Sequence, residues 1–206
     1  MDALPRGVPG LLCLGCGVVA LGLGGSISHP VIAGWLGVIG MILTLHYGLF
    51  YMLALILNGL GLRVRPIMGN PLGLTSLTRF WGGTWNRAFT DAIHPLVVRP
   101  LTRRFGAKRA LLLAFFLSGL AHELVISFPA GAGYGGPMVY FLLQAFGMMA
   151  ERSPRGRRWH LSQGIWGRCP LTVCVLAPAP ILFHPPFLEK VIQLFLQFLT
   201  THVILL

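Results

Sequence analysis

The chain has 206 residues, of which 55% are hydrophobic and 10% are charged, and Lys and Arg outnumber Asp and Glu by sixteen to five. This composition excludes an ordinary soluble domain and is typical of an integral membrane protein. The net charge of +11 does not indicate a nucleic-acid partner, because the basic residues lie at the ends of apolar runs, as in membrane proteins with basic cytoplasmic loops.

Two apolar runs open the chain. Residues 11–24 are short enough to be the core of a signal peptide, but their small residues and the lack of a convincing cleavage site favour a first membrane span. Residues 31–60 are long enough to cross a bilayer with tilt. His46 lies in this second run, where a lone histidine is more often a packing residue than a ligand.

The polar interval 61–109 is predicted to contain an amphipathic helix at the membrane interface, capped by Thr75 or Ser76. Apolar residues recur there at helical spacing: Leu77, Phe80, Trp81, Trp85, Ala88, Phe89, Ala92 and Ile93. Asn86 falls on the opposite side. Two glycines, Gly82 and Gly83, weaken a helix and open space next to that amide.

Residues 110–128 are almost entirely apolar and predict a membrane-spanning helix. His122 and Glu123 would lie roughly 18 Å from its Arg-flanked end, near the middle of the bilayer. Ionisable groups at that depth are candidates for a functional site. Ser118 precedes His122 by one turn on the same face, whereas Glu123 points about 100° away. Glu123 is therefore either a buried structural acid, neutral or paired with an arginine, or a group that tunes the site.

Three further apolar runs, 137–150, 170–183 and 187–206, predict two more spans and a last segment that is a span or a surface helix. Pro178 and Pro180 should kink or end the second of them. The prediction is an all-α, polytopic membrane bundle of about six transmembrane helices, forming one domain over 1–206. With the N-terminus inside, fifteen of the sixteen basic residues face the cytoplasm.

The four cysteines lie in, or at the end of, apolar segments. Cys13 and Cys16 have the spacing of a metal-binding pair, but no second ligand pair accompanies them, so packing is the favoured role. We expect no metal site and no bound cofactor.

Several of these segments together resemble a known family. Asn70-Pro71, the stretch Thr-Ser-Leu-Thr-Arg-Phe-Trp-Gly-Gly-Thr-Trp-Asn at 75–86, and Arg99-Pro100 resemble the signature of wax synthases in the membrane-bound O-acyltransferase superfamily. Phe-Leu-Ser-Gly-Leu-Ala-His-Glu at 116–123 resembles their second motif, and Glu151 and the stretch 183–187 resemble later segments. The motif-bearing core is about 70–187. The Trp-Asn element is also similar to that of sterol and diacylglycerol acyltransferases.

The resemblance implies an enzyme that moves an acyl group from acyl-CoA, its co-substrate, to the hydroxyl of a long-chain or terpenoid alcohol. His122 would be the general base, and Asn86 would orient the imidazole or the thioester, or donate to the developing oxyanion. The residues expected to contact substrate are Trp81, Trp85, Arg79, Arg87, Ser118 and Glu123. Cytoplasmic arginines suit the phosphates of CoA, and they suit anionic lipid headgroups equally.

Two alternatives stay open. A small transporter or proton-conducting bundle could use His122 and Glu123, although it would need neither the Trp-Asn helix nor the basic loops. A catalytically inactive, shortened relative is the other, because typical plant members of the family are longer. The expected location is a bacterial inner membrane or the endoplasmic reticulum. The sequence sets neither the acceptor alcohol nor the oligomeric state.

Overall fold

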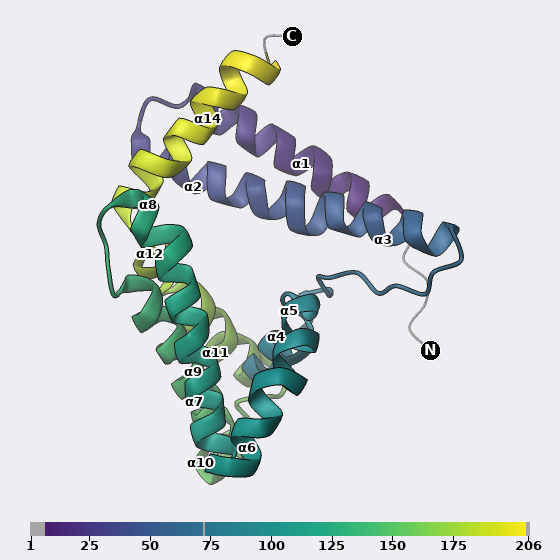
Figure 1. Ribbon diagram of the computed structural model, residues 1–206, viewed down its shortest axis with the longest axis vertical. Helices are drawn as coiled ribbons and strands as arrows, with labels where there is room; N and C mark the ends of the chain where they lie inside the picture. Colours follow the sequence, from purple (N-terminus) through teal and green to yellow (C-terminus); the bar gives the residue numbers. More distant parts are fainter. Residues whose placement is uncertain (1–6, 72, 205–206) are drawn as a thin grey trace. The chain divides into compact units, whose positions relative to one another are not determined.

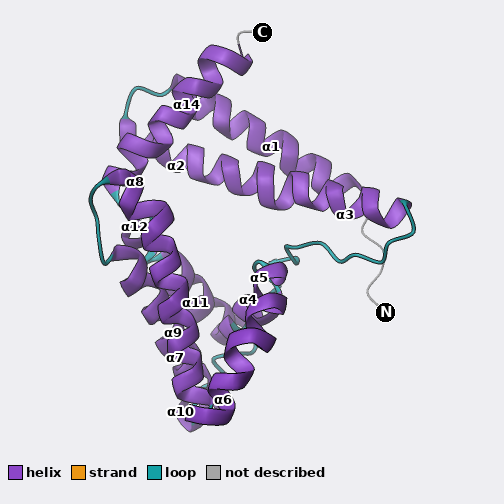
Figure 2. Ribbon diagram, in the orientation of Figure 1, coloured by secondary structure: helices purple, strands orange, loops and turns teal. Residues whose placement is uncertain are grey.

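The computed structural model describes residues 7–71 and 73–204, and this part of the chain consists of helices and connecting loops, without strands (Figure 2). The all-α fold expected from the sequence is therefore confirmed. The chain divides into two compact units, one drawn from Met1–Met68 and Pro185–Leu206 and the other formed by Gly69–His184. The second unit has nearly the limits of the motif-bearing core, 70–187. A single domain over 1–206 stays a prediction.

The first unit is built on a helical hairpin. Its first arm is α1 (Gly7–Ser26), and its second arm runs from α2 (Pro30–Met41) through the π-helical turn η1 (Ile42–Leu49) into α3 (Phe50–Gly59) (Figure 1). The other part of the unit is a helical run of α13 (Pro185–Phe187), η4 (Leu188–Ile192), α14 (Gln193–Leu199) and η5 (Thr200–Ile204). Glycines allow close helix contacts, since a Cβ at Gly17 would collide with Thr44 and one at Gly37 with Ile192.

The number of expected membrane spans needs correction. In the part of the chain that the structure describes, four helices rather than six are long and apolar enough to cross a membrane: Val8–Ser26, Pro30–Gly59, Ala107–Ala130 and Gly164–Leu182. The expected fourth span is the helix α9 (Gly136–Arg152), whose 17 residues extend only about 25 Å, less than a hydrocarbon core of about 30 Å. The expected last span is helical over its described residues, but it carries Glu189, Lys190 and two glutamines.

The second unit is organised around an antiparallel helical hairpin. Its first arm is α7 (Ala107–His122), continued by the π-helical turn η3 (Glu123–Ser127) and α8 (Phe128–Ala130), and its second arm is α9. The arms approach closely at Gly119, where an added Cβ would lie 2.9 Å from Cα of Met138. Met138 therefore occupies the space beside Gly119.

The amphipathic segment forms two short helices instead of one continuous helix. Ser76 caps α4 (Leu77–Gly83), as predicted, because its Oγ accepts from the amide of Arg79 at 3.2 Å. The chain then turns at Thr84–Asn86 and restarts as α5 (Arg87–Ile93). Asn86 takes a left-handed conformation with φ 44°, which asparagine tolerates better than most residues. The break therefore lies at the Gly-Gly and Asn positions, where helix propensity is weakest.

A buried glutamine holds α9 against α11 (Gly164–Leu176), which is followed by α12 (Ala179–Leu182). Pro178 has no amide proton, so the carbonyl of Cys174 loses the helical donor four residues later. The side chain of Gln144, which is 0% exposed, supplies a replacement, because its Nε2 donates to the oxygen of Cys174 at 2.6 Å. The Oε1 of Gln144 accepts from Nε1 of Trp81 at 3.2 Å, so the same glutamine also links α4 to α9.

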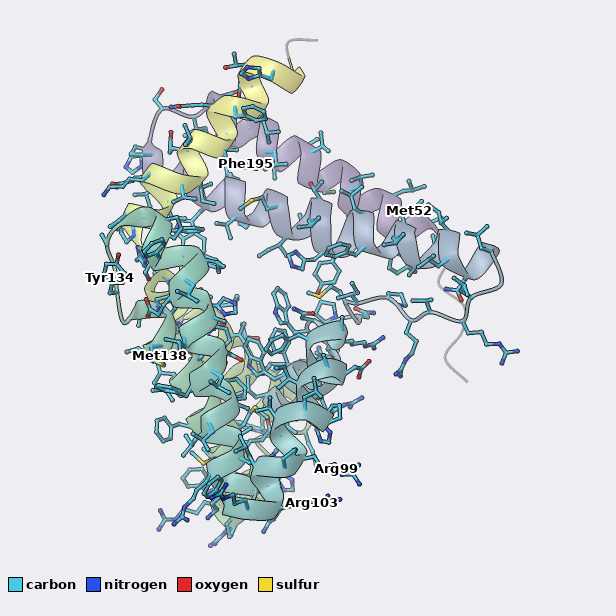
Figure 3. The ribbon with its side chains drawn as sticks, in the orientation of Figure 1. Met52, Arg99, Arg103, Tyr134, Met138 and Phe195 are labelled. Atoms are coloured by element: carbon cyan, nitrogen blue, oxygen red, sulfur yellow. The ribbon has the colours of Figure 1, made fainter. Side chains whose placement is uncertain are left out.

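Two basic segments lie at one end of the α7–α9 hairpin. α6 (Arg99–Phe105) immediately precedes α7, and α10 (Pro154–Arg158) immediately follows α9. Because the two arms are antiparallel, both segments occupy the end opposite the 131–135 turn. Figure 3 shows Arg99 and Arg103 at one end of the hairpin and Tyr134 at the other.

This arrangement predicts a labelling pattern. In a chain whose four native cysteines are replaced, a cysteine at Arg158 should react with an impermeant maleimide only from the cytoplasmic side, and one at Tyr134 only from the opposite side. Both side chains are exposed, so neither substitution disturbs packing. Labelling of intact and opened vesicles measures the pattern, and reaction of both cysteines from one side would contradict it.

Candidate active site

A cavity of about 350 Å³ lies within the second unit, between the α4–α5 segment, α7 and α9. The α4–α5 side contributes Trp81, Gly82, Trp85, Asn86, Phe89 and Thr90. The α7 side contributes Ala107, Leu111, Ala114, Phe115, Ser118 and His122. Both the expected apolar stripe and Asn86 reach this cavity, because the break between α4 and α5 turns the asparagine toward the side that the tryptophans line.

The cavity is elongated along α7. Its α7 residues follow the spacing of one helix face, and the fifteen-residue step from Ala107 to His122 corresponds to about 22 Å. Phe141, Met148 and Arg152 line it from α9 in the reverse order. His122 and Phe141 therefore lie toward one end, and Arg152 lies at the basic end.

His122 is held in one tautomer by its own helix. Its Nδ1 lies 2.7 Å from the carbonyl oxygen of Ser118. A carbonyl has no proton to donate, so Nδ1 carries the hydrogen and Nε2 carries the lone pair in the neutral ring. Among residues 7–71 and 73–204, no group forms a hydrogen bond with Nε2. The contact comes from the backbone of Ser118 and not from its side chain.

The face of the His122 ring packs against Phe141, with the ring centroids 4.3 Å apart and the planes inclined by 44°. Phe141 also lies near Phe115 and Trp81, at centroid distances of 6.3 and 5.7 Å. These rings form an aromatic wall next to the imidazole. The wall and the hydrogen bond to Ser118 together restrain the direction of Nε2.

Asn86 lines the same cavity and also has a structural role. Its Oδ1 accepts from the amide of Phe89 at 3.1 Å, which caps the N-terminus of α5. The oxygen of this amide acts as an acceptor, and its NH₂ is the hydrogen-bond donor of the side chain. Asn86 therefore contributes to the local fold as well as to the cavity.

The two expected tryptophans also line the cavity. Trp85 stacks on Phe80, with centroids 5.6 Å apart and an interplanar angle of 24°. Gly82 and Gly83 leave open space beside them, since an added Cβ at either position would meet nothing within 4 Å. This part of the site agrees with the space that the sequence suggested next to Asn86.

Three of the residues expected to bind substrate do not line the cavity. The Arg79 side chain is exposed, and Arg87 donates from Nε to the carbonyl of Gly83 at 2.7 Å. Glu123 accepts from backbone amides at the start of α9, and in the described part of the chain none of its hydrogen bonds involves an arginine. Of the two readings of Glu123, the contacts favour the structural one.

The structure adds residues that the sequence did not single out. Arg152 lines the basic end of the cavity, and its Nε donates to Oγ1 of Thr78 at 3.1 Å. Gln144 positions Trp81, and the signal that would have found it is a lone amide inside an apolar run. No comparable signal marked Arg152, which looked like one arginine among many. In the described part of the chain, no three His, Cys, Asp or Glu side chains gather as metal ligands.

Comparison with known proteins supports the resemblance seen in the motifs. Residues 64–143 match the model of the Membrane bound O-acyl transferase family. The chain is 29% identical to the "Probable long-chain-alcohol O-fatty-acyltransferase 2" of Arabidopsis thaliana, over 64% of this chain and 41% of that protein. It is 30% identical to "Acyl-CoA--sterol O-acyltransferase 1" of the same plant, over 61% of this chain and 39% of that protein.

A shorter match has higher identity. The chain is 36% identical to the "Long-chain-alcohol O-fatty-acyltransferase" of Simmondsia chinensis, over 32% of this chain and 21% of that protein. The chain thus spans about two fifths or less of the length of these curated relatives. No solved structure matches it.

Proposed function

Because this chain is a wax synthase-like member of the membrane-bound O-acyltransferase family, we propose that it transfers an acyl group from acyl-CoA to the hydroxyl of a lipophilic alcohol. The observation that carries the proposal is the tautomer of His122. Its Nδ1 donates to the carbonyl of Ser118, so Nε2 is the nitrogen that can accept a proton. His122 and Asn86 line the same cavity. A long-chain alcohol is the preferred acceptor, since most of the matched relatives are named long-chain-alcohol O-fatty-acyltransferases.

The proposed reaction is a direct transfer. The alcohol oxygen attacks the thioester carbonyl carbon while Nε2 of His122 accepts the hydroxyl proton. The new C–O bond forms, the carbonyl oxygen becomes negatively charged, and the NH₂ of Asn86 donates a hydrogen bond to it. The C–S bond then breaks as the carbonyl re-forms. The thiolate takes the proton from the His122 imidazolium, which restores the neutral ring.

The cavity suggests an orientation for the acyl donor. Arg152 and the basic segments α6 and α10 lie at one end, and His122 lies about 22 Å along α7 from Ala107 at that end. We place the phosphates of the nucleotide at the basic end, where guanidinium groups bind them well. The pantetheine arm then extends through the cavity toward His122, and the aromatic wall contacts the acyl group or the alcohol.

The direct test is an assay of the purified full chain in lipid vesicles with labelled acyl-CoA, with and without a long-chain alcohol. The proposal expects labelled ester and free CoA in equal amounts when alcohol is present. A transporter forms no ester under either condition, and an inactive relative leaves the acyl-CoA intact. Release of free fatty acid alone would show hydrolysis and would contradict transfer.

Arg152 gives a prediction that concerns donor binding. Arg152→Ala should raise the KM for acyl-CoA by roughly tenfold, the effect of losing a hydrogen bond to a charged group, and leave kcat nearly unchanged. Initial rates at varied acyl-CoA measure the split. Arg155→Ala is the matched control, because Arg155 is exposed at the same end but does not line the cavity. An equal rise of KM in both variants would mean that the basic surface acts without a specific role for Arg152.

A further inference from the structure

A second group of polar side chains lies at the end of the hairpin away from the basic segments, and it does not line the cavity. It consists of Glu123, Ser127, Gly133 and His184, which we call the hairpin latch. These residues come from η3, from the turn between α8 and α9, and from the second residue after α12. Ser127 is 0% exposed and His184 is 7% exposed.

Glu123 joins η3 to the start of α9. Its Oε1 accepts from the amide of Gly135 at 2.9 Å and from the amide of Met138 at 3.2 Å. These amides belong to the first turn of α9, whose donors have no partner within the helix. A carboxylate is also favoured there by the helix dipole. Glu123, which follows His122 directly, thus fixes the register of the two arms.

Ser127 and His184 add a second connection. The hydroxyl of Ser127 lies 3.4 Å from the carbonyl oxygen of Gly133 and 3.3 Å from Nε2 of His184. Ser127 thus links the turn at Gly133 to the ring of His184, and the tautomer of His184 sets which of the two groups donates. Burial lowers the pKa of His184, although the charge of Glu123 opposes this effect, so the ring is neutral at physiological pH.

The turn is shaped to receive this ring. Gly133 has φ +75°, and a Cβ added there would collide with the imidazole of His184. The cluster contains a serine, a histidine and a glutamate, but it cannot work as a hydrolytic triad. Ser127 is completely buried, so no substrate can reach its hydroxyl.

We propose that the hairpin latch is a positioning device for His122. It locks η3, which begins directly after His122, onto the start of α9, which carries Phe141 one turn after Met138. Phe141 is the ring that packs on His122 at 4.3 Å. Loosening the latch lets α9 shift against α7, so the imidazole loses the contact that aims Nε2. The inference rests on the proposed function of His122 as the base.

The test compares two substitutions of His184 in the purified full chain. His184→Phe keeps a ring over Gly133 but removes the hydrogen bond to Ser127. We expect it to lower kcat per folded molecule by roughly tenfold, because small displacements of reacting groups have large effects on rate, with the KM for acyl-CoA unchanged. His184→Gln restores a side chain that can form this hydrogen bond, as donor or acceptor, and should retain most of the wild-type kcat. If His184 acts in folding alone, His184→Phe would lower the amount of folded protein and leave kcat per folded molecule unchanged.

A second measurement does not depend on activity. The rate at which diethyl pyrocarbonate modifies His122, followed by mass spectrometry, should rise severalfold in His184→Phe and stay near the wild-type value in His184→Gln. His202 is an internal control, because it is exposed and its Nδ1 contacts the carbonyl of Phe198, four residues before it, in the same way. Its rate should not change in either variant.

Ser127→Ala provides the answer if His184→Phe does not accumulate, since it removes the same two hydrogen bonds with a small change of volume. An unchanged kcat together with an unchanged modification rate of His122 would overturn the latch. If the wild-type protein forms no ester, the proposed function fails, and the modification rates of His122 still decide whether the latch positions the ring.

Discussion

Replacement of His122 by Gln is expected to reduce ester formation by roughly 10²-fold or more, the usual contribution of a positioned general base. Glutamine is similar in size and polar, but its amide cannot take the proton of the alcohol. The KM for acyl-CoA should change little, because the nucleotide would be held at the basic end of the cavity. Steady-state rates at varied acyl-CoA concentration measure both quantities.

The matched control for this substitution is His202→Gln. His202 makes the same contact from Nδ1 to a carbonyl four residues earlier, but it is exposed and lies outside the second unit. It should keep the wild-type rate.

In the wild-type enzyme, activity should fall as the pH decreases through the pKa of His122, because an imidazolium has no lone pair for the proton. Activity that stays constant through the titration range of histidine would contradict the role of a base.

Asn86→Asp is expected to lower kcat by roughly 10²-fold or more, comparable to the loss of one donor to an oxyanion. The carboxylate can still accept from the amide of Phe89 and tolerates the left-handed backbone, so α5 keeps its cap. It cannot donate to the developing oxyanion, and its charge would oppose that of the oxyanion. The kcat of protein purified at matched levels measures the effect.

Asn86→Ala separates the two roles of this residue. It should lose turnover to a similar extent, and it should also lower stability by about 1–2 kcal/mol, because the cap is lost and alanine is unfavourable at φ 44°. Thermal unfolding in detergent measures the second effect. Near-normal turnover in Asn86→Asp would show that Asn86 acts only as a cap, and the oxyanion role would be withdrawn.

The central helix and the place of His122 in it were predictable, because both depend on local information. The apolar run around His122 is long enough to define a span, and helical spacing alone puts Ser118 one turn away. The motif resemblance added the expectation that Asn86 belongs to the same site. The number of membrane spans was predicted less accurately, because α9 is apolar enough to be taken for a span but is only 17 residues long.

The break at Asn86 could not be predicted, because helical periodicity continues across it from Phe80 to Phe89. The left-handed turn there depends on tertiary contacts such as that between Trp81 and Gln144, which come from segments far apart in the sequence. The hydrogen-bond partners of Glu123 could not be predicted for the same reason. Its hydrogen bonds to Gly135 and Met138 follow from the register of the hairpin, which no local pattern specifies.

The measurement that tests the central claim most directly is a single-turnover experiment with labelled acyl-CoA and a long-chain alcohol, comparing the wild-type chain with His122→Gln at matched amounts of folded protein. The enzyme is in excess over the labelled acyl-CoA and at a concentration that saturates its binding, so the rate reports the chemical step. We predict that labelled ester forms readily in the wild type and is slower by roughly 10²-fold in the variant. Equal rates of ester formation in the two proteins would contradict the assignment of His122 as the base.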